Sequence, residues 1–304
     1  MKAVVFGGSG FLGSHVADAL TEKKFNVTIF DNVESPYISS DQQMIVGDIL
    51  NPVDVEEAVK GSDYVFNFAG IADIDEANEN PIAAVQNNIL GNTFILESCY
   101  KNEVKRFVFA STIYVYSDLG GVYRSSKQAC ELIIENYQKL YGLDFTILRY
   151  GSLYGKRANN FNFVNKIINQ ALIEGKISRK GDGEEIRDYI NVVDAARCSV
   201  EVLKDEFANQ HVIIKGTQTI KIKDFLSMIK EILGNTIEIE YSSERIPEHY
   251  EITPYNFKPK VAKNLIMDYF HDLGQGILEV IYDVYNQLDE KDVPMKIPFD
   301  KSSS

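Results

Sequence analysis

Several features are scarce in this chain of 304 residues, and each scarcity excludes a class of protein. The three cysteines, Cys99, Cys130 and Cys198, form no C-x-x-C pair, and each lies inside a helical pattern. Such placement favours small buried apolar side chains over a disulfide or a metal site. The four histidines are scattered without an H-E-x-x-H spacing. We therefore predict neither zinc chemistry nor any other metal centre.

Long apolar runs and a surplus of basic residues are also missing. No run reaches the roughly 18 to 20 apolar residues that a membrane span needs, and the first residues resemble a strand rather than a leader peptide. The chain has 31 lysines and arginines against 44 acidic residues, which gives a formal net charge of −13. An acidic chain repels phosphate backbones. We expect a cytoplasmic protein with neither a membrane nor a nucleic acid as partner.

The first half of the chain alternates short β-branched runs with amphipathic stretches. This alternation is typical of a doubly wound α/β fold, in which helices cover both faces of a parallel sheet. The expected strands are 3–6, 27–31, 44–46, 64–68, 106–110 and 145–149, and the expected helices are 10–20, 53–59, 82–100 and 125–140.

The pattern changes after about residue 151, where a polar, asparagine-rich stretch begins. We infer a smaller mixed α/β lobe that shares a cleft with the first. The expected elements after residue 151 are a helix at 163–174, a turn at Gly181 and Gly183, a strand at 212–215, a helix at 220–233, a strand at 237–241, a loop at 246–259 and a helix at 275–288.

Three glycines lie between the first strand and the first helix. In the segment GGSGFLG, Gly7, Gly10 and Gly13 have the spacing G-x-x-G-x-x-G. Without a Cβ, the backbone can approach a pyrophosphate, and the helix N-terminus offers free N–H groups and a positive dipole end. In a strand–loop–helix context this pattern strongly indicates a dinucleotide site, with Phe11 and Leu12 in the first helical turn.

Asp31 ends the second strand, about 20 residues beyond the glycine loop, where a carboxylate can hold the ribose hydroxyls of NAD. The same carboxylate would repel the 2′-phosphate of NADP, and no arginine follows it, since the next residue is Asn32. We therefore predict NAD as the cofactor. The alternative is that Asp31 only caps a turn, and the glycine loop upstream disfavours it.

A set of proton-handling residues follows the fifth expected strand. Tyr123 and Lys127 are four residues apart, so on a helix they share one face. An ammonium beside a phenol favours the phenolate and would lower the pKa of the tyrosine, which makes it a usable acid and base. Ser111 and Thr112 stand at the carboxyl end of the strand, where open α/β sheets bind ligands.

Together these motifs resemble the extended short-chain dehydrogenases/reductases, in the NAD-dependent epimerase/dehydratase group, over nearly the whole chain. Thr112, Tyr123 and Lys127 match the catalytic triad of that family. The segments RYGSLYG and RDYINVVD resemble two further segments of its sugar-nucleotide epimerases. The predicted cofactor set is Gly7, Gly10, Phe11, Leu12, Gly13, Asp31, Asn32, Asp48, Ile49, Phe68, Ala69, Gly70, Asn88, Tyr123 and Lys127.

The resemblance also implies a nucleotide-sugar substrate. Arg187 would grip its diphosphate, which an arginine fork suits. Thr112, Ser152, Asn160 and Arg187 are the predicted substrate-binding residues. Residues 1–151 and about 190–214 are then expected to form the NAD-binding Rossmann domain, and residues 152–189 and 215–304 the substrate-binding lobe.

We predict the reaction by excluding the other reactions that members of the family catalyse. Its dehydratases place Asp-Glu directly after the catalytic threonine, and its decarboxylases place a glutamate in that stretch. Here Ile113 and Tyr114 follow Thr112. We therefore favour a 4-epimerase that works through a transient 4-keto sugar. A 4-keto-sugar-nucleotide reductase that uses the same residues is the alternative, and a non-catalytic dinucleotide sensor or scaffold is disfavoured by the intact triad.

The resemblance further implies a homodimer, in which helices 82–100 and 125–140 of two subunits form a four-helix bundle. Apolar residues on more than one face of these helices would serve that interface, or would only cover the sheet. Examples are Ile89, Phe94, Leu96, Ile133, Ile134 and Leu140.

Overall fold

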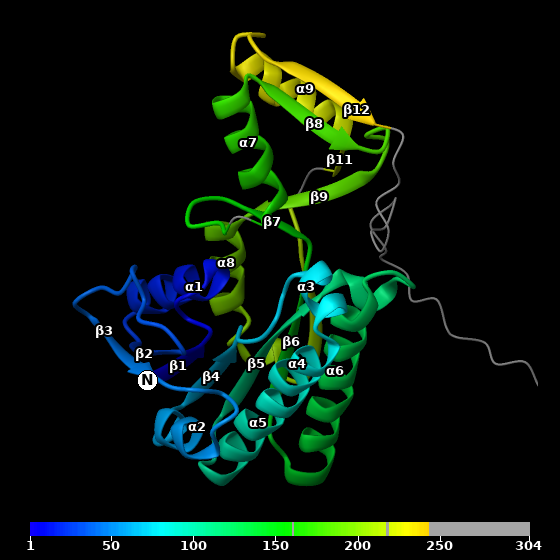
Figure 1. Ribbon diagram of the computed structural model, residues 1–304. Coiled ribbons are helices and arrows are strands. Elements are labelled where there is room, and N and C mark those ends of the chain that lie inside the picture. Colours follow the sequence, from blue (N-terminus) through cyan, green and yellow to red (C-terminus); the bar gives the residue numbers. More distant parts are fainter. Residues whose placement is uncertain (160, 217–218, 243–304) are drawn as a thin grey trace, which may run out of the picture. The chain divides into compact units, whose positions relative to one another are not determined.

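A computed structural model describes residues 1–159, 161–216 and 219–242 of the chain. Its main element is a seven-stranded sheet with the order β10-β6-β5-β4-β1-β2-β3, and every neighbouring pair is parallel (Figure 1). The strands are β1 (Lys2–Phe6), β2 (Asn26–Asp31), β3 (Gln42–Val46), β4 (Tyr64–Asn67), β5 (Arg106–Thr112), β6 (Phe145–Tyr150) and β10 (Gln210–Ile214). The predicted doubly wound α/β fold is confirmed.

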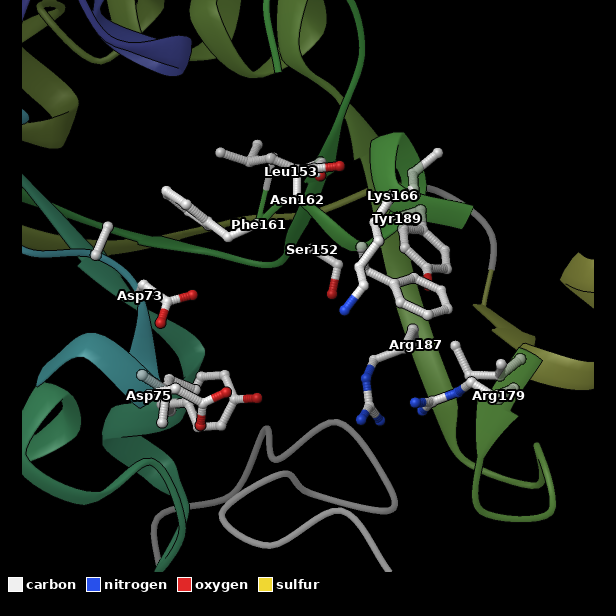
Figure 2. Close-up of a pocket in the computed structure, with 16 residues that line it drawn as sticks. Asp73, Asp75, Ser152, Leu153, Phe161, Asn162, Lys166, Arg179, Arg187 and Tyr189 are labelled. Atoms are coloured by element: carbon white, nitrogen blue, oxygen red, sulfur yellow. Dashed lines mark hydrogen bonds between the residues drawn. The ribbon is translucent and has the colours of Figure 1, made fainter. Parts of the chain in front are cut away.

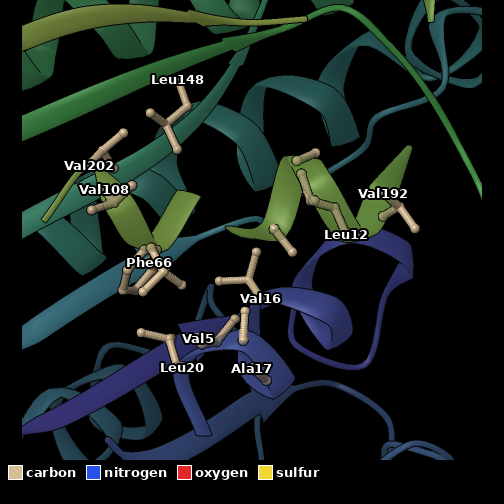
Figure 3. Close-up of a cluster of buried hydrophobic side chains, with 14 of the residues drawn as sticks. Val5, Leu12, Val16, Ala17, Leu20, Phe66, Val108, Leu148, Val192 and Val202 are labelled. Carbon is tan, nitrogen blue, oxygen red and sulfur yellow. The ribbon is translucent and has the colours of Figure 1, made fainter. Parts of the chain in front are cut away.

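Helices cover both faces of this sheet. Helices α1 (Phe11–Glu22) and α8 (Val192–Glu201) pack on one face, where Val5, Val16 and Phe66 are fully buried (Figure 3). The apolar residues that pack on the other face come from α2 (Pro52–Val59), α5 (Asn92–Lys101) and α6 (Gly121–Tyr141). Strands buried on both sides are mostly apolar along their whole length, which explains why the sequence pattern revealed them.

The chain order reverses between β1 and β4, which lie side by side in the centre of the sheet. From β1 the chain continues to β2 and β3 on one side, and β4, β5 and β6 follow on the other. Such a switch point leaves a crevice beyond the carboxyl ends of the strands, and open α/β sheets bind ligands there.

The second half of the described chain contains two smaller sheets, β11-β9-β7 and β12-β8. Their strands are β7 (Ser152–Tyr154), β8 (Lys176–Lys180), β9 (Ile186–Asn191), β11 (Thr219–Lys221) and β12 (Glu238–Ser242). Helices α7 (Phe163–Glu174) and α9 (Ile222–Ile232) share an apolar core with these strands. The expected loop at 246–259 and helix at 275–288 lie outside the described residues.

Several details differ from the sequence-based expectations. Strands β7, β8 and β9 were not expected, because they are short and carry many polar residues. The helix expected from residue 220 begins at 222, since Thr219–Lys221 pairs with β9 as an antiparallel strand.

The long helix expected over 82–100 consists of three segments. They are α4 (Pro81–Ala84), a π-helical segment (Val85–Gly91) and α5. Gly91 is the last residue of the π-helical segment and packs against Ile49. A Cβ at this position would lie 2.8 Å from Ile49 Cδ1. Short π-helical insertions often occur at functional sites.

Among the described residues, no helix has the length and apolar character to cross a membrane.

Candidate active site

Two adjoining cavities extend along the carboxyl edge of the central sheet. One, of about 510 Å³, is lined by Asp31, Asn32, Asp48 and Ile49. The other, of about 480 Å³, is lined by Thr112, Tyr123 and Lys127 together with Phe11, Leu12 and Gly13. Both share Gly7, Gly10, Phe68 and Gly70 as walls, and Ala69 lines the first. The structure therefore brings nearly the whole predicted cofactor set to one continuous trough.

The glycine loop depends on close backbone packing. Gly7 has a φ of +74°, and a Cβ added there would lie 2.6 Å from the backbone nitrogen of Ala69. A Cβ on Gly13 would overlap the carbonyl oxygen of Gly7. Helix α1 begins at Phe11, and no side chain caps its first N–H groups. The loop thus leaves backbone donors at a positive helix end, which suits a pyrophosphate.

Asp31 supports this loop from the end of β2. Its Oδ2 accepts the backbone N–H of Ser9 at 2.9 Å, and its Oδ1 accepts that of Asn32 at 2.8 Å. The carboxylate still forms part of the cavity wall. Asp31 therefore braces the loop and also lines the cavity.

Asn88 lies behind the trough rather than in its wall. Its side-chain amide is bonded to both backbone groups of Ile71, with Ile71 N to Oδ1 at 2.7 Å and Nδ2 to Ile71 O at 3.0 Å. Nδ2 also donates to Ser126 Oγ at 2.9 Å. Asn88 thereby holds the loop after β4 against the helix that carries Tyr123 and Lys127.

The three residues of the predicted triad meet at the end of β5. Thr112 is the last residue of that strand, and Tyr123 and Lys127 lie on the first two turns of α6. Thr112 is a neighbour of Tyr123, and its side chain acts to lower the pKa of that phenol. The buried ammonium of Lys127 donates to the carbonyl oxygen of Ala110 at 2.8 Å and lies 4.7 Å from the centre of the Phe109 ring.

The pKa of Tyr123 differs from the sequence-based expectation. We expected Lys127 to lower it, but desolvation by the surrounding protein raises the pKa of Tyr123 to about 12, and the Thr112 side chain opposes this only in part. The Lys127 ammonium is directed to a backbone carbonyl instead and lies 5.9 Å from the centre of the Tyr123 ring. Burial also lowers the pKa of Lys127.

A third cavity, of about 350 Å³, adjoins the trough and shares Ala72, Leu153, Phe161 and Asn162 with it. Two predicted substrate residues, Ser152 on β7 and Arg187 on β9, line this cavity (Figure 2). Asn160 lies outside the described residues.

Two further cations line the third cavity, Lys166 on α7 and Arg179 on β8 (Figure 2). The guanidinium of Arg179 forms an ion pair of 3.0 Å with Glu185 and lies 5.1 Å from the centre of the Phe163 ring. Its Nε has no hydrogen-bond partner within the described chain. We had not predicted Arg179, because the segment KISRK gives no sign of a buried strand.

Carboxylates reach the cavities from α3 (Ile74–Glu79) and the loop before it. Asp73 caps this helix by accepting the N–H of Glu76 at 2.8 Å. Asp73 and Asp75 line the third cavity, and Glu76 lines both parts of the trough. These acidic groups lie outside the stretch directly after Thr112, where the absence of carboxylates favours epimerisation over elimination.

Comparisons with known proteins agree with this geometry. The model of the NAD-dependent epimerase/dehydratase family matches residues 3–214. A putative UDP-glucose 4-epimerase from Methanocaldococcus jannaschii is 29% identical over 91% of this chain and 96% of its own. A UDP-N-acetyl-alpha-D-glucosaminuronate decarboxylase from Bacillus cytotoxicus is also 29% identical, over 92% of this chain and 96% of its own.

A solved structure extends the likeness to three dimensions. A mutant UDP-glucuronic acid 4-epimerase from Bacillus cereus, in complex with UDP-4-deoxy-4-fluoro-glucuronic acid and NAD, superimposes with a TM-score of 0.77. It is 25% identical and covers 86% of this chain and 95% of its own. With a family match over more than half of its residues, the chain belongs to the NAD-dependent epimerase/dehydratase family.

Proposed function

We propose that this enzyme is an NAD-dependent 4-epimerase of a nucleotide-activated sugar. The observation that carries the proposal is the continuity of the site. The glycine loop, Thr112, Tyr123 and Arg187 line cavities that share walls. One ligand can therefore lie with its diphosphate near Arg187 and its sugar beside Tyr123.

The trough fits a dinucleotide. A Cβ on Gly7 or Gly13 would strike backbone atoms, and the uncapped start of α1 supplies N–H donors for a pyrophosphate. We propose that Asp31 holds the adenosine ribose and that Lys127 meets the nicotinamide ribose. Bound NAD supplies one chemical capability, the reversible acceptance of a hydride from a carbinol carbon.

In the mechanism we propose, Tyr123 handles the proton. Its phenolate oxygen takes the proton of the C4 hydroxyl as that carbon loses its hydride, which leaves a 4-keto sugar. Thr112 donates to the same sugar oxygen and orients it. After the keto sugar turns its other face to the cofactor, Tyr123 returns the proton to the C4 oxygen as C4 regains a hydride on that face. The protein thus ends each cycle in the state in which it began.

We propose that the second lobe, residues 152–189 and 215–304, binds the nucleotide part of the substrate, with residues 1–151 and about 190–214 as the NAD-binding domain. Arg187 would hold the diphosphate through paired N–H···O bonds. Ser152 lines the same cavity, and Asn160 completes the proposed substrate set. UDP-sugars are the first substrates to test, because the relatives named above act on them.

We also propose that the protein is a cytoplasmic homodimer in which α5 and α6 of two subunits pack together.

The test is to incubate the purified protein with a panel of nucleotide sugars, without added cofactor, and to resolve the products by NMR. A C4 epimer formed without net NADH supports the proposal and identifies the substrate. NADH consumption with 4-keto sugars, and no product without cofactor, would establish the reductase instead. A 4-keto-6-deoxy product would assign an elimination, for which the carboxylates of α3 are the candidate acids and bases.

A further inference from the structure

A buried ion pair lies directly behind the carboxyl end of β5. Arg149 Nη2 lies 2.6 Å from Glu131 Oε2, and Arg149 Nε lies 3.1 Å from Glu131 Oε1. The side chain of Glu131 is only 7% exposed and that of Arg149 15%. A bidentate contact of this kind fixes the orientation of both side chains as well as the distance between them.

The carboxylate of this pair holds a residue next to the triad. Ser111 Oγ donates to Glu131 Oε1 at 2.5 Å. Glu131 lies one turn beyond Lys127 on α6, and Lys127 donates to the carbonyl of Ala110. Two successive turns of α6 thus hold two successive residues of β5, Ala110 and Ser111. Thr112 follows directly, and it lines the same cavity as Tyr123.

The arginine of the pair contacts the segment that follows Thr112. Arg149 Nη1 donates to Tyr116 Oη at 2.5 Å, and its guanidinium lies over the Tyr116 ring. Tyr116 ends the short 3₁₀ helix (Ile113–Tyr116) that follows Thr112. Arg149 Nη2 also lies 2.8 Å from His211 Nδ1. Because arginine can only donate, Nδ1 must accept, and Nε2–H is left to donate to Glu135.

We propose that Glu131 is a positioning residue for the reaction. Through Ser111 before Thr112, and through Arg149 and Tyr116 after it, Glu131 fixes the strand end against α6, so that the Thr112 hydroxyl and the Tyr123 phenol stay aligned on one sugar oxygen. Glu131 itself lines none of the three cavities described above. The inference rests on the proposed function, because it assigns an effect on the same proton transfer.

The test compares four variants with wild type in steady-state kinetics. Ser111→Ala leaves the ion pair in place and removes only the bond to β5, so we expect kcat to fall about tenfold with unchanged KM and NAD affinity. Ser111→Thr keeps the hydroxyl and should restore most of kcat. Glu131→Gln should lower kcat at least as far. Glu135→Gln, one turn further along α6, contacts His211 rather than Ser111 and should behave as wild type.

Glu131→Gln leaves Arg149 without its carboxylate and can fail to fold. If it does, the comparison of kcat between Ser111→Ala and Ser111→Thr tests the inference by itself. A wild-type kcat in Ser111→Ala, or a rise in KM alone, would overturn the inference. Wild-type protein that epimerises no sugar refutes the proposed function instead. The same variants are then compared in 4-keto-sugar reduction, which the same triad would perform.

Discussion

At the scale of single residues, the proposed chemistry depends on the phenol of Tyr123. In Tyr123→Phe the ring keeps its place beside Thr112, but no group can take the C4 proton. We expect kcat to fall by at least about 10²-fold, the lower range for loss of a general acid or base. NAD affinity and thermal stability should stay near wild type, measured by calorimetric titration and thermal melting. Wild-type turnover in this variant would remove Tyr123 from the mechanism.

The pH dependence of the same phenol gives a second prediction. Its pKa of about 12 means that Tyr123 of the cofactor-free protein stays protonated throughout the neutral and mildly alkaline range. Oxidised NAD carries a positive charge on its nicotinamide ring, and a nearby positive charge favours the phenolate, so NAD should lower this pKa. The measurement is the phenolate ultraviolet absorbance against pH, taken as wild type minus Tyr123→Phe, with and without NAD. Equal titration curves would contradict the prediction.

The spacing of residues predicted candidates that the structure brings to one trough, but it did not predict their environment. Gly7, Asp31 and Tyr123 were identifiable because their motifs have fixed offsets along one chain. The raised pKa of Tyr123 arises from burial by distant segments, which no local motif encodes. Position at the strand end did not separate Ser111 from Thr112, and only the resemblance to the family selected Thr112. In the structure the Ser111 hydroxyl donates to Glu131, whereas Thr112 lines the cavity beside Tyr123.

At the scale of elements, the start of α1 determines whether the cofactor can bind. A Cβ in Gly13→Ala would overlap the Gly7 carbonyl, so the loop and the helix must separate. We expect a loss of stability of about 3 kcal/mol, as for overpacking, and a loss of NAD binding. Gly142→Ala is the control, because its Cβ meets nothing within 4 Å and only its φ of +73° is unfavourable. Gly142→Ala should lower the free energy of unfolding by about 1 kcal/mol and leave NAD affinity unchanged.

The carboxylates of α3 separate two reaction classes. Epimerisation needs no acid or base beyond Tyr123, so Asp75→Asn should leave the rate of C4 inversion at the wild-type level. An elimination would need a second proton carrier, and Asp75 lines the third cavity. The NMR assay described above, repeated with the variant, checks this. A large fall in kcat with unchanged KM would place Asp75 in the chemistry and argue against simple epimerisation.

Strands could be predicted from the sequence where burial on both faces makes them mostly apolar. The central strands are apolar on both faces, and their runs stand out in the sequence. Strands β8 and β9 have the sequences KISRK and IRDYIN, and they carry Arg179 and Arg187, which line the third cavity. These two arginines interrupt the apolar pattern of the two strands, so apolar periodicity could not reveal them.

At the scale of the whole molecule, the proposed dimer needs an apolar surface on α5 and α6. Most of the side chains predicted for it lie elsewhere, since Leu96 and Ile134 are buried in the core and Ile89 and Ile133 pack against it. Periodicity alone could not separate residues that cover the sheet from residues that face outward. The structure does expose Leu140, as expected, and the other large exposed apolar residues on these two helices are Tyr100, Leu132 and Tyr141; the ring centres of Tyr100 and Tyr141 lie 4.8 Å apart.

A charge on this surface should therefore break the dimer. Leu132 and Leu140 are 61% and 71% exposed, two turns apart on α6, and Leu132→Arg would bring an unpaired charge into an apolar interface. We expect sedimentation at micromolar concentration to change from dimer to monomer. Leu172→Arg on α7, where the leucine is 66% exposed, is the matched control and should remain dimeric. Because the glycine loop, the triad and Arg187 all belong to one chain, the monomer should still bind NAD and turn over substrate. A wild type that already sediments as a monomer would refute the interface and leave the proposed chemistry untouched.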